Sequence, residues 1–116
     1  MEKLKLEKFY YWIIFNLKTK KKFLDLKGDK NYPLKYDFYL PKHNILIEYD
    51  GEQHFEPIFN WDTEKSFSQR KKYDKIKNNY AIQNNYILIR IPYTHYNDLC
   101  LEDLLKDSKF IIKEEY

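Results

Sequence analysis

The 116-residue chain contains few of the residues that build turns, disulfides or cysteine metal sites: two glycines, four prolines and one cysteine. A single cysteine, Cys100, excludes an intramolecular disulfide and a cysteine zinc cluster. No run approaches the roughly 18–20 apolar residues of a membrane-spanning helix. The aromatic stretch 9–15 is followed by lysines, without a small-residue cleavage site. We therefore expect one intracellular domain over residues 1–116, with no secretion signal and no membrane association.

Hydrophobic residues make up 43% of the chain and aromatic residues 19%. This composition is typical of a chain with a packed core. The net charge of +3 is unevenly distributed. Residues 1–35 hold ten lysines and four acids, a net +6, whereas residues 36–116 hold eleven basic residues and fourteen acids, a net −3. A cationic first third beside an acidic remainder favours a protein that binds a polyanion near a carboxylate cluster. A general enrichment in lysine explains the same charge equally well.

Hydrophobic periodicity predicts seven elements, in the order α-β-β-β-α-β-α. The predicted strands are 21–28, 34–40, 45–50 and 84–93. The predicted helices are 2–16, 66–84 and 97–115, the last of them capped by Asn97 or Asp98. This order predicts an α/β fold with a mixed central sheet flanked by helices.

The stretch NILIEYDGEQHF crowds ionisable residues directly after an apolar strand. A hairpin around the turn 41–44 would place Asp37 opposite Glu48. The same register would place Lys35 opposite Asp50. Facing residues have Cβ atoms roughly 4.5–5.5 Å apart, so the three carboxylates would share one patch and repel one another. Folding alone does not favour that arrangement, and a cation must compensate it.

A hard divalent cation is the natural compensator of this patch. Mg²⁺ takes carboxylate oxygens and retains several waters, whereas the histidines are too scattered to favour a zinc site. With Asp37, Glu48 and Asp50 as its ligands, Mg²⁺ would leave positions for a phosphate oxygen and would activate a water for phosphodiester hydrolysis. The sequence therefore predicts Mg²⁺ as the cofactor, with Mn²⁺ as a substitute.

The segments YDFYLP, NILIEYDGEQHF and YDKIKNNYAIQNNYILIRIPY together resemble the PD-(D/E)xK nuclease superfamily. The resemblance covers roughly residues 20–95 and is greatest to the branch of very-short-patch-repair-like endonucleases, which includes phage-associated homing endonucleases. It implies a restriction-endonuclease-like core in which the acids at Asp37 and Glu48 bind metal. It also implies an Mg-dependent endodeoxyribonuclease, a hydrolase that acts on the phosphodiester bonds of DNA.

One position departs from the family pattern. The family usually has a lysine two residues after the third-strand acid, and Asp50 occupies that position here. In the branch with an acid-x-acid-Gly ending, the resemblance assigns proton transfer to His54 and the orientation of a water or phosphate to Gln53. Lys35 is the alternative source of the missing cation. The departure also leaves open a catalytically inactive nucleic-acid-binding module of the same fold, and a protein-interaction domain is a third class.

The polar helix carries further candidates. Arg70, Asp74 and Lys77 share one helical face, which either forms a surface ion-pair ladder or, as the resemblance favours, directs Asp74 and Lys77 toward the site. Glu2 or Glu7 is the candidate for an additional acid from the first helix. Because no specificity module is recognisable, we expect a homodimer or a separate DNA-binding partner domain. Basic residues expected to contact DNA phosphates without reading bases are Lys20, Lys21, Lys22, Arg70, Lys71 and Lys72.

Overall fold

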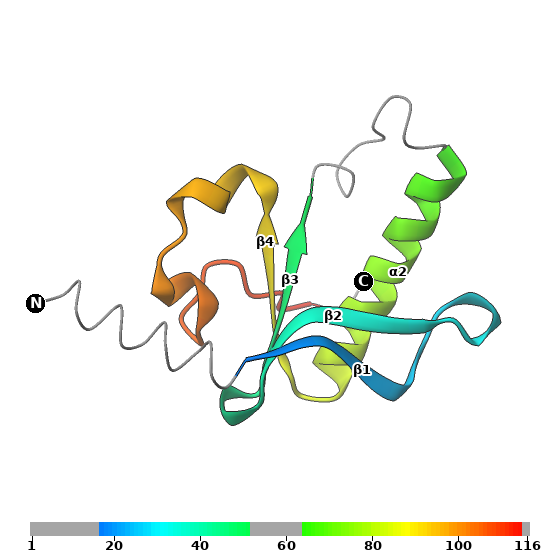
Figure 1. The fold of residues 1–116 in the computed structure, drawn as a ribbon, viewed down its shortest axis with the longest axis horizontal. Helices are drawn as coiled ribbons and strands as arrows, with labels where there is room; N and C mark the ends of the chain where they lie inside the picture. The colour runs from blue at the N-terminus through cyan, green and yellow to red at the C-terminus, as the bar shows by residue number, and fades with distance from the viewer. Residues whose placement is uncertain (1–16, 52–63, 115–116) are drawn as a thin grey trace, which may run out of the picture.

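A computed structural model describes residues 17–51 and 64–114 of the chain, which form a four-stranded sheet, one α-helix and short 3-10 helices (Figure 1). The sheet has the order β1-β2-β3-β4. Its first three strands run antiparallel, and β4 is parallel to β3 because helix α2 carries the chain back between them. No helix in these ranges is long and apolar enough to cross a bilayer. The bounds are β1 Lys18–Lys27, β2 Pro33–Leu40, β3 Ile45–Asp50, α2 Glu64–Gln83 and β4 Ile87–Pro92.

The β2–β3 hairpin has the predicted register. Phe38 pairs with Ile47 and Leu40 pairs with Ile45. The turn between them is a 3-10 helix at Pro41–His43, closed by an asparagine in the left-handed conformation, which asparagine tolerates better than most residues. The short loop fixes which residues face each other, and the register confirms the hairpin that places the acids together.

The pairing between β2 and β3 ends at Phe38 and Ile47. Lys35 still pairs with Lys22 of β1 on the other side of β2, but the predicted pair of Lys35 with Asp50 does not form, because the β2–β3 ladder does not extend that far. The long β1–β2 ribbon therefore separates from β3 beyond this point, and Asp37 lies where the two strands diverge.

Two apolar clusters cover opposite faces of the sheet. Helix α2 packs on one face, where Leu46 and Leu88 contact Ala81. The C-terminal segment packs on the other, where Ile47 and Ile89 are buried; Figure 1 shows these layers on either side of β3 and β4. Strand β2 contributes to both clusters, with Leu34 and Tyr36 on the α2 face and Phe38 and Leu40 on the opposite face.

The predicted α-β-β-β-α-β-α order is wrong: the described elements follow β-β-β-α-β, supplemented by 3-10 helices. The predicted helix at 2–16 lies outside the described residues. The predicted helix at 97–115 is absent from its described part, where the chain forms the 3-10 helices Tyr93–Asp98 and Leu101–Leu104. The prediction of a restriction-endonuclease-like core, with several helices flanking the sheet, is therefore wrong for the described residues. The sheet has α2 on one face, and the other face is covered by irregular chain and short 3-10 helices.

The C-terminal segment is not helical because it covers the edge of β4. The Arg90 N–H donates to the Phe110 carbonyl at 3.1 Å, and the Ile112 N–H donates to the Leu88 carbonyl at 2.9 Å. Ile111 forms an isolated antiparallel bridge with Ile89. These tertiary hydrogen bonds and the burial of the segment outweigh a helix preference of less than about 1 kcal/mol per residue.

Asp103 distinguishes the observed 3-10 helix from a continuous α-helix. Its carboxylate accepts the Cys100 N–H at 3.0 Å, and this hydrogen bond holds the pKa of Asp103 below its ordinary value. Asp103→Ala should therefore lower the free energy of unfolding by about 1 kcal/mol at pH 7, whereas within a continuous helix alanine would raise it by a few tenths. Urea denaturation measures the difference, with Asp107→Ala as the control for loss of an exposed acid.

The loss of stability in Asp103→Ala should depend on pH. Because the folded-state pKa of Asp103 is lowered, its stabilising effect is complete above the unfolded-state pKa and is lost as pH falls through the folded-state value. The wild type and Asp103→Ala should therefore converge in acid. A gain in stability at pH 7 would favour the continuous helix.

Candidate functional site

Asp37 and Glu48 lie side by side where the β2–β3 pairing ends, as the register predicts. Glu48 Oε1 accepts the Asp37 N–H at 2.9 Å, and Asp37 Oδ2 accepts the Tyr49 N–H at 2.9 Å. Each carboxylate thus replaces a backbone hydrogen bond of the hairpin. Glu48 is only 3% exposed, whereas Asp37 is half-buried. The two side chains form a carboxylate pair between diverging strands.

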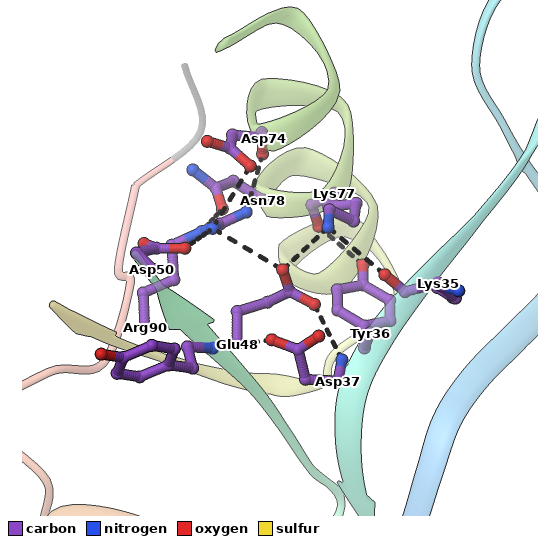
Figure 2. A network of polar contacts seen from close by, with 10 residues as sticks. Lys35, Tyr36, Asp37, Glu48, Asp50, Asp74, Lys77, Asn78 and Arg90 are labelled. Atoms are coloured by element: carbon purple, nitrogen blue, oxygen red, sulfur yellow. Dashed lines mark hydrogen bonds and ion pairs between the residues drawn. The ribbon is translucent and has the colours of Figure 1, made fainter. Parts of the chain in front are cut away.

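Lys77 reaches this pair from helix α2 (Figure 2). Its Nζ lies 2.8 Å from Glu48 Oε2 and donates to the Lys35 carbonyl at 3.3 Å. The Tyr36 hydroxyl donates to the Lys77 carbonyl at 2.7 Å, which ties the helix to β2. A lysine therefore stands beside the third-strand acid although β3 itself carries none. The exposed side chain of Lys35 points away from Glu48 in Figure 2.

Arg90, which is not among the residues predicted from the sequence, is the central cation of the polar network on the α2 face. Arg90 Nη1 lies 2.8 Å from Asp50 Oδ1 and 3.5 Å from Asp74 Oδ1. It is also 4.0 Å from Glu48 Oε2, and its Nε donates to Asn78 Oδ1 (Figure 2). The available signal was a lone arginine in the apolar strand ILIRIP, which parallel pairing places opposite Glu48.

Asp50 is paired with this arginine rather than placed beside Asp37. Within residues 17–51 and 64–114, no three His, Cys, Asp or Glu side chains gather closely enough to hold a metal ion. The predicted three-acid ligand set is therefore reduced to the pair Asp37 and Glu48. Asp74 and Lys77 do face the site, as the resemblance implied. The remaining candidates, Gln53, His54, Glu2 and Glu7, lie outside the described residues.

Two internal cations neutralise part of the acidic patch. Burial raises the pKa of Glu48 above its ordinary value; the charge of Lys77 opposes this rise, and Asp37 adds to it. In the described part of the chain, these two cations lie within ion-pair distance of three carboxylates, those of Glu48, Asp50 and Asp74. The patch is thus compensated from within the chain by Lys77 and Arg90.

A cleft of about 1030 Å³ opens over the carboxylate pair. Its described acidic lining consists of Asp37, Glu48 and Asp74. Its described basic lining consists of Lys20, Lys35, Arg70 and Lys77. Aromatic side chains also line it, namely Tyr32, Phe38, Tyr49 and Tyr73.

Of the six basic residues predicted to contact DNA, Lys20 and Arg70 line this cleft. The others are not among its described lining residues. The ammonium group of Lys21 lies over the Phe23 ring, 4.9 Å from its centroid, and Lys72 pairs with Asp29 at 2.5 Å. Of the predicted DNA-binding residues, Lys20 and Arg70 therefore lie in the cleft that contains the acids, and the other four are not among its described lining.

Comparison with known proteins adds little to this geometry. No protein-family model matches the chain, and no solved structure matches it. A segment of 65 residues is 35% identical to the uncharacterized protein 307L of Invertebrate iridescent virus 6. The match covers 55% of this chain and 33% of the viral protein, so the chain spans about a third of that relative's length.

Removing Arg90 should leave the buried carboxylate of Asp50 without its 2.8 Å ion-pair partner. We expect Arg90→Leu to lower the free energy of unfolding by about 3–5 kcal/mol, because removing one partner of a buried ion pair is strongly destabilising. Adding Asp50→Asn to this variant should restore part of the loss. Chemical denaturation of the two single variants and the double variant measures this coupling, and additive losses would contradict it.

Lys77 should control the proton affinity of Glu48. Because the charge of Lys77 counteracts the rise caused by burial, Lys77→Met should raise the pKa of Glu48 further. An NMR titration of the glutamate carboxyl carbons, assigned with Glu48→Gln, measures the shift, and Lys75→Met controls for removal of an exposed lysine from the same helix. An unchanged Glu48 pKa in Lys77→Met would show that the pair is not maintained in solution.

The raised pKa of Glu48 also has a stability consequence. The folded protein holds this proton to higher pH than the unfolded chain does, so ionisation of Glu48 lowers the free energy of unfolding as pH rises from the ordinary glutamate pKa of 4.5 to the folded-state pKa. Lys77→Met should widen that pH window and deepen the fall.

Proposed function

We propose that this protein is a metal-dependent DNA endonuclease with the chemistry of the PD-(D/E)xK nucleases that its sequence resembles. One observation supports the proposal above the others. The Asp37–Glu48 carboxylate pair, with Lys77 on Glu48, lines a cleft whose described walls also carry Lys20 and Arg70. Paired carboxylates beside a lysine, in a cleft with further basic side chains, suit hydrolysis of a phosphodiester.

The donor atoms of the pair fit Mg²⁺ or Mn²⁺. Mg²⁺ is commonly held by one or two carboxylates together with substrate phosphates and retained waters, and no third acid, histidine or cysteine joins the pair in the described part of the chain. Zinc sites usually use three or four protein ligands, so zinc fits less well. When bound, a divalent ion would polarise the phosphodiester and lower the pKa of a water.

The side chains around the pair have separate roles in this proposal. Asp37 and Glu48 would hold the ion. Lys77 is the group positioned to bind a phosphate oxygen, because it contacts Glu48 and also lines the cleft. Arg90 is a positioning residue, since it fixes Asp50, Asp74 and Asn78 behind Glu48. Lys20 and Arg70 would bind phosphates farther along the strand.

A second candidate function is a nucleic-acid-binding module without catalysis. The specific observation in its favour is that both oxygens of Glu48 are already engaged, one by the Asp37 N–H and one by the Lys77 ammonium. In that case Lys77 takes the place of a metal ion, and the cleft binds a strand without cleaving it.

Asp37→Asn should separate the two functions. If Asp37 holds the ion, this variant should nick supercoiled plasmid in Mg²⁺ or Mn²⁺ no faster than the wild type does in EDTA. Its DNA affinity in EDTA should be unchanged or higher, because removal of a negative charge eases the approach of phosphate. Calorimetric titration with Mn²⁺ should show that its metal affinity is lost, and Asp107→Asn, which removes an exposed acid outside the described cleft lining, should behave as the wild type.

Two outcomes would contradict the nuclease proposal. If the wild type fails to cleave plasmid, single-stranded and mismatched DNA in either metal while still binding them, the binding module is supported. If Asp37→Asn retains wild-type metal affinity, the carboxylate pair is not the metal site.

A further inference from the structure

Two tyrosines lie against each other on the wall of the cleft, where the β1–β2 turn meets helix α2. The rings of Tyr32 and Tyr73 are nearly parallel, with an interplanar angle of 8° and centroids 6.3 Å apart. Tyr73 is half-buried, whereas Tyr32 is 60% exposed. Both line the same cleft as Asp37 and Glu48. The two rings give the cleft an aromatic wall. Because Tyr32 is largely exposed, packing of the hydrophobic core does not explain an aromatic residue at this position.

The turn that carries Tyr32 is held firmly against the helix. The Tyr73 hydroxyl accepts the Asp29 N–H at 3.3 Å, and Lys72 pairs with Asp29 at 2.5 Å. Gly28 allows the close approach, because a Cβ atom at this position would lie 2.6 Å from the Tyr73 ring. The β1–β2 turn, at the right of Figure 1, is therefore docked through Tyr73. The docked turn thus holds the Tyr32 ring beside that of Tyr73.

The charges around these rings indicate what kind of ligand would stack there. Arg70 lines the cleft one helical turn before Tyr73, and Lys35 lines it on β2. An aromatic surface beside spaced cations is the arrangement that binds a single strand, since each base has a flat face and each linkage a negative charge. In a duplex the base faces are already stacked on their neighbours, so such a ring can reach a base only where it is unpaired.

We propose that Tyr32, supported by Tyr73, is a stacking platform for an unpaired nucleobase of a strand whose phosphodiester lies over Asp37 and Glu48. This inference rests on the proposed function and names its substrate class: single-stranded or locally unpaired nucleic acid. Both DNA and RNA strands offer the same flat face and the same phosphate charge, and the experiment below distinguishes them.

Binding of short fluorescein-labelled oligonucleotides, measured by anisotropy in EDTA to prevent cleavage, tests the platform. Tyr32→Leu should weaken binding of a single strand about tenfold, the order expected for one lost stacking contact. Its affinity for a blunt duplex of the same sequence should change less than about twofold. Tyr32→Trp, which keeps a flat ring, should restore strand binding. Tyr93→Leu is the matched control, because Tyr93 is 37% exposed but is not among the described residues lining the cleft.

A base analogue adds a direct readout. The fluorescence of 2-aminopurine in the strand should be quenched by the wild type and by Tyr32→Trp, and not by Tyr32→Leu. A DNA strand and an RNA strand of the same sequence form separate arms, and the tighter of the two identifies the source of the base. Equal strand affinity of the wild type and Tyr32→Leu, or equal losses on strand and duplex, would overturn the platform.

Failure of the platform and failure of the nuclease proposal give different results. If Tyr32→Leu binds strands as the wild type does while metal-dependent nicking is present, the nuclease proposal stands without the platform. If Tyr32→Leu loses strand binding while the wild type cleaves no substrate in Mg²⁺ or Mn²⁺, the platform stands on a binding module.

Discussion

The ion pair between Arg90 and Asp50 is the interaction on which the arrangement of the site depends. Strand β3 carries Glu48 and Asp50 into the interface with α2, where an unpaired carboxylate would cost several kcal/mol. Arg90 comes from the neighbouring parallel strand and also contacts Asp74 and Asn78 of the helix. One buried side chain thus joins β3, β4 and α2 at the level of the acids. The acids can remain on this face because the fold supplies their counter-charge.

Local signals were sufficient to predict the hairpin and the helix. Alternating apolar residues and a short turn at 41–44 leave one register for β2 and β3, because a slip by one residue would move Glu48 to the opposite face. That register brought Asp37 to Glu48 without any knowledge of the rest of the fold. The polar helix was predicted at 66–84 and is found at Glu64–Gln83. Where pairing partners are close in sequence, composition and spacing determine the structure.

Contacts between residues far apart in the sequence could not be predicted from local patterns. Glu48 and Arg90 face each other only because β4 pairs in parallel with β3 after the crossover through α2, and no local pattern specifies that pairing. The C-terminal segment has the composition of a helix, yet Ile112 and Phe110 hydrogen-bond to β4. The spacing of Arg70, Asp74 and Lys77 places all three on one helical face, and the packing of α2 on β2 brings Lys77 to Glu48.

The contact between Lys77 and Glu48 couples the two ligands that the proposed function requires. While Lys77 lies 2.8 Å from Glu48 Oε2, it occupies an oxygen that a metal ion would use. An ion that binds this oxygen competes with the ammonium group, and a Lys77 released from Glu48 is available to a phosphate that enters the cleft. A phosphate that attracts Lys77 would in turn free Glu48 for the ion. Such coupling is reciprocal, so we expect metal and strand each to bind more tightly in the presence of the other.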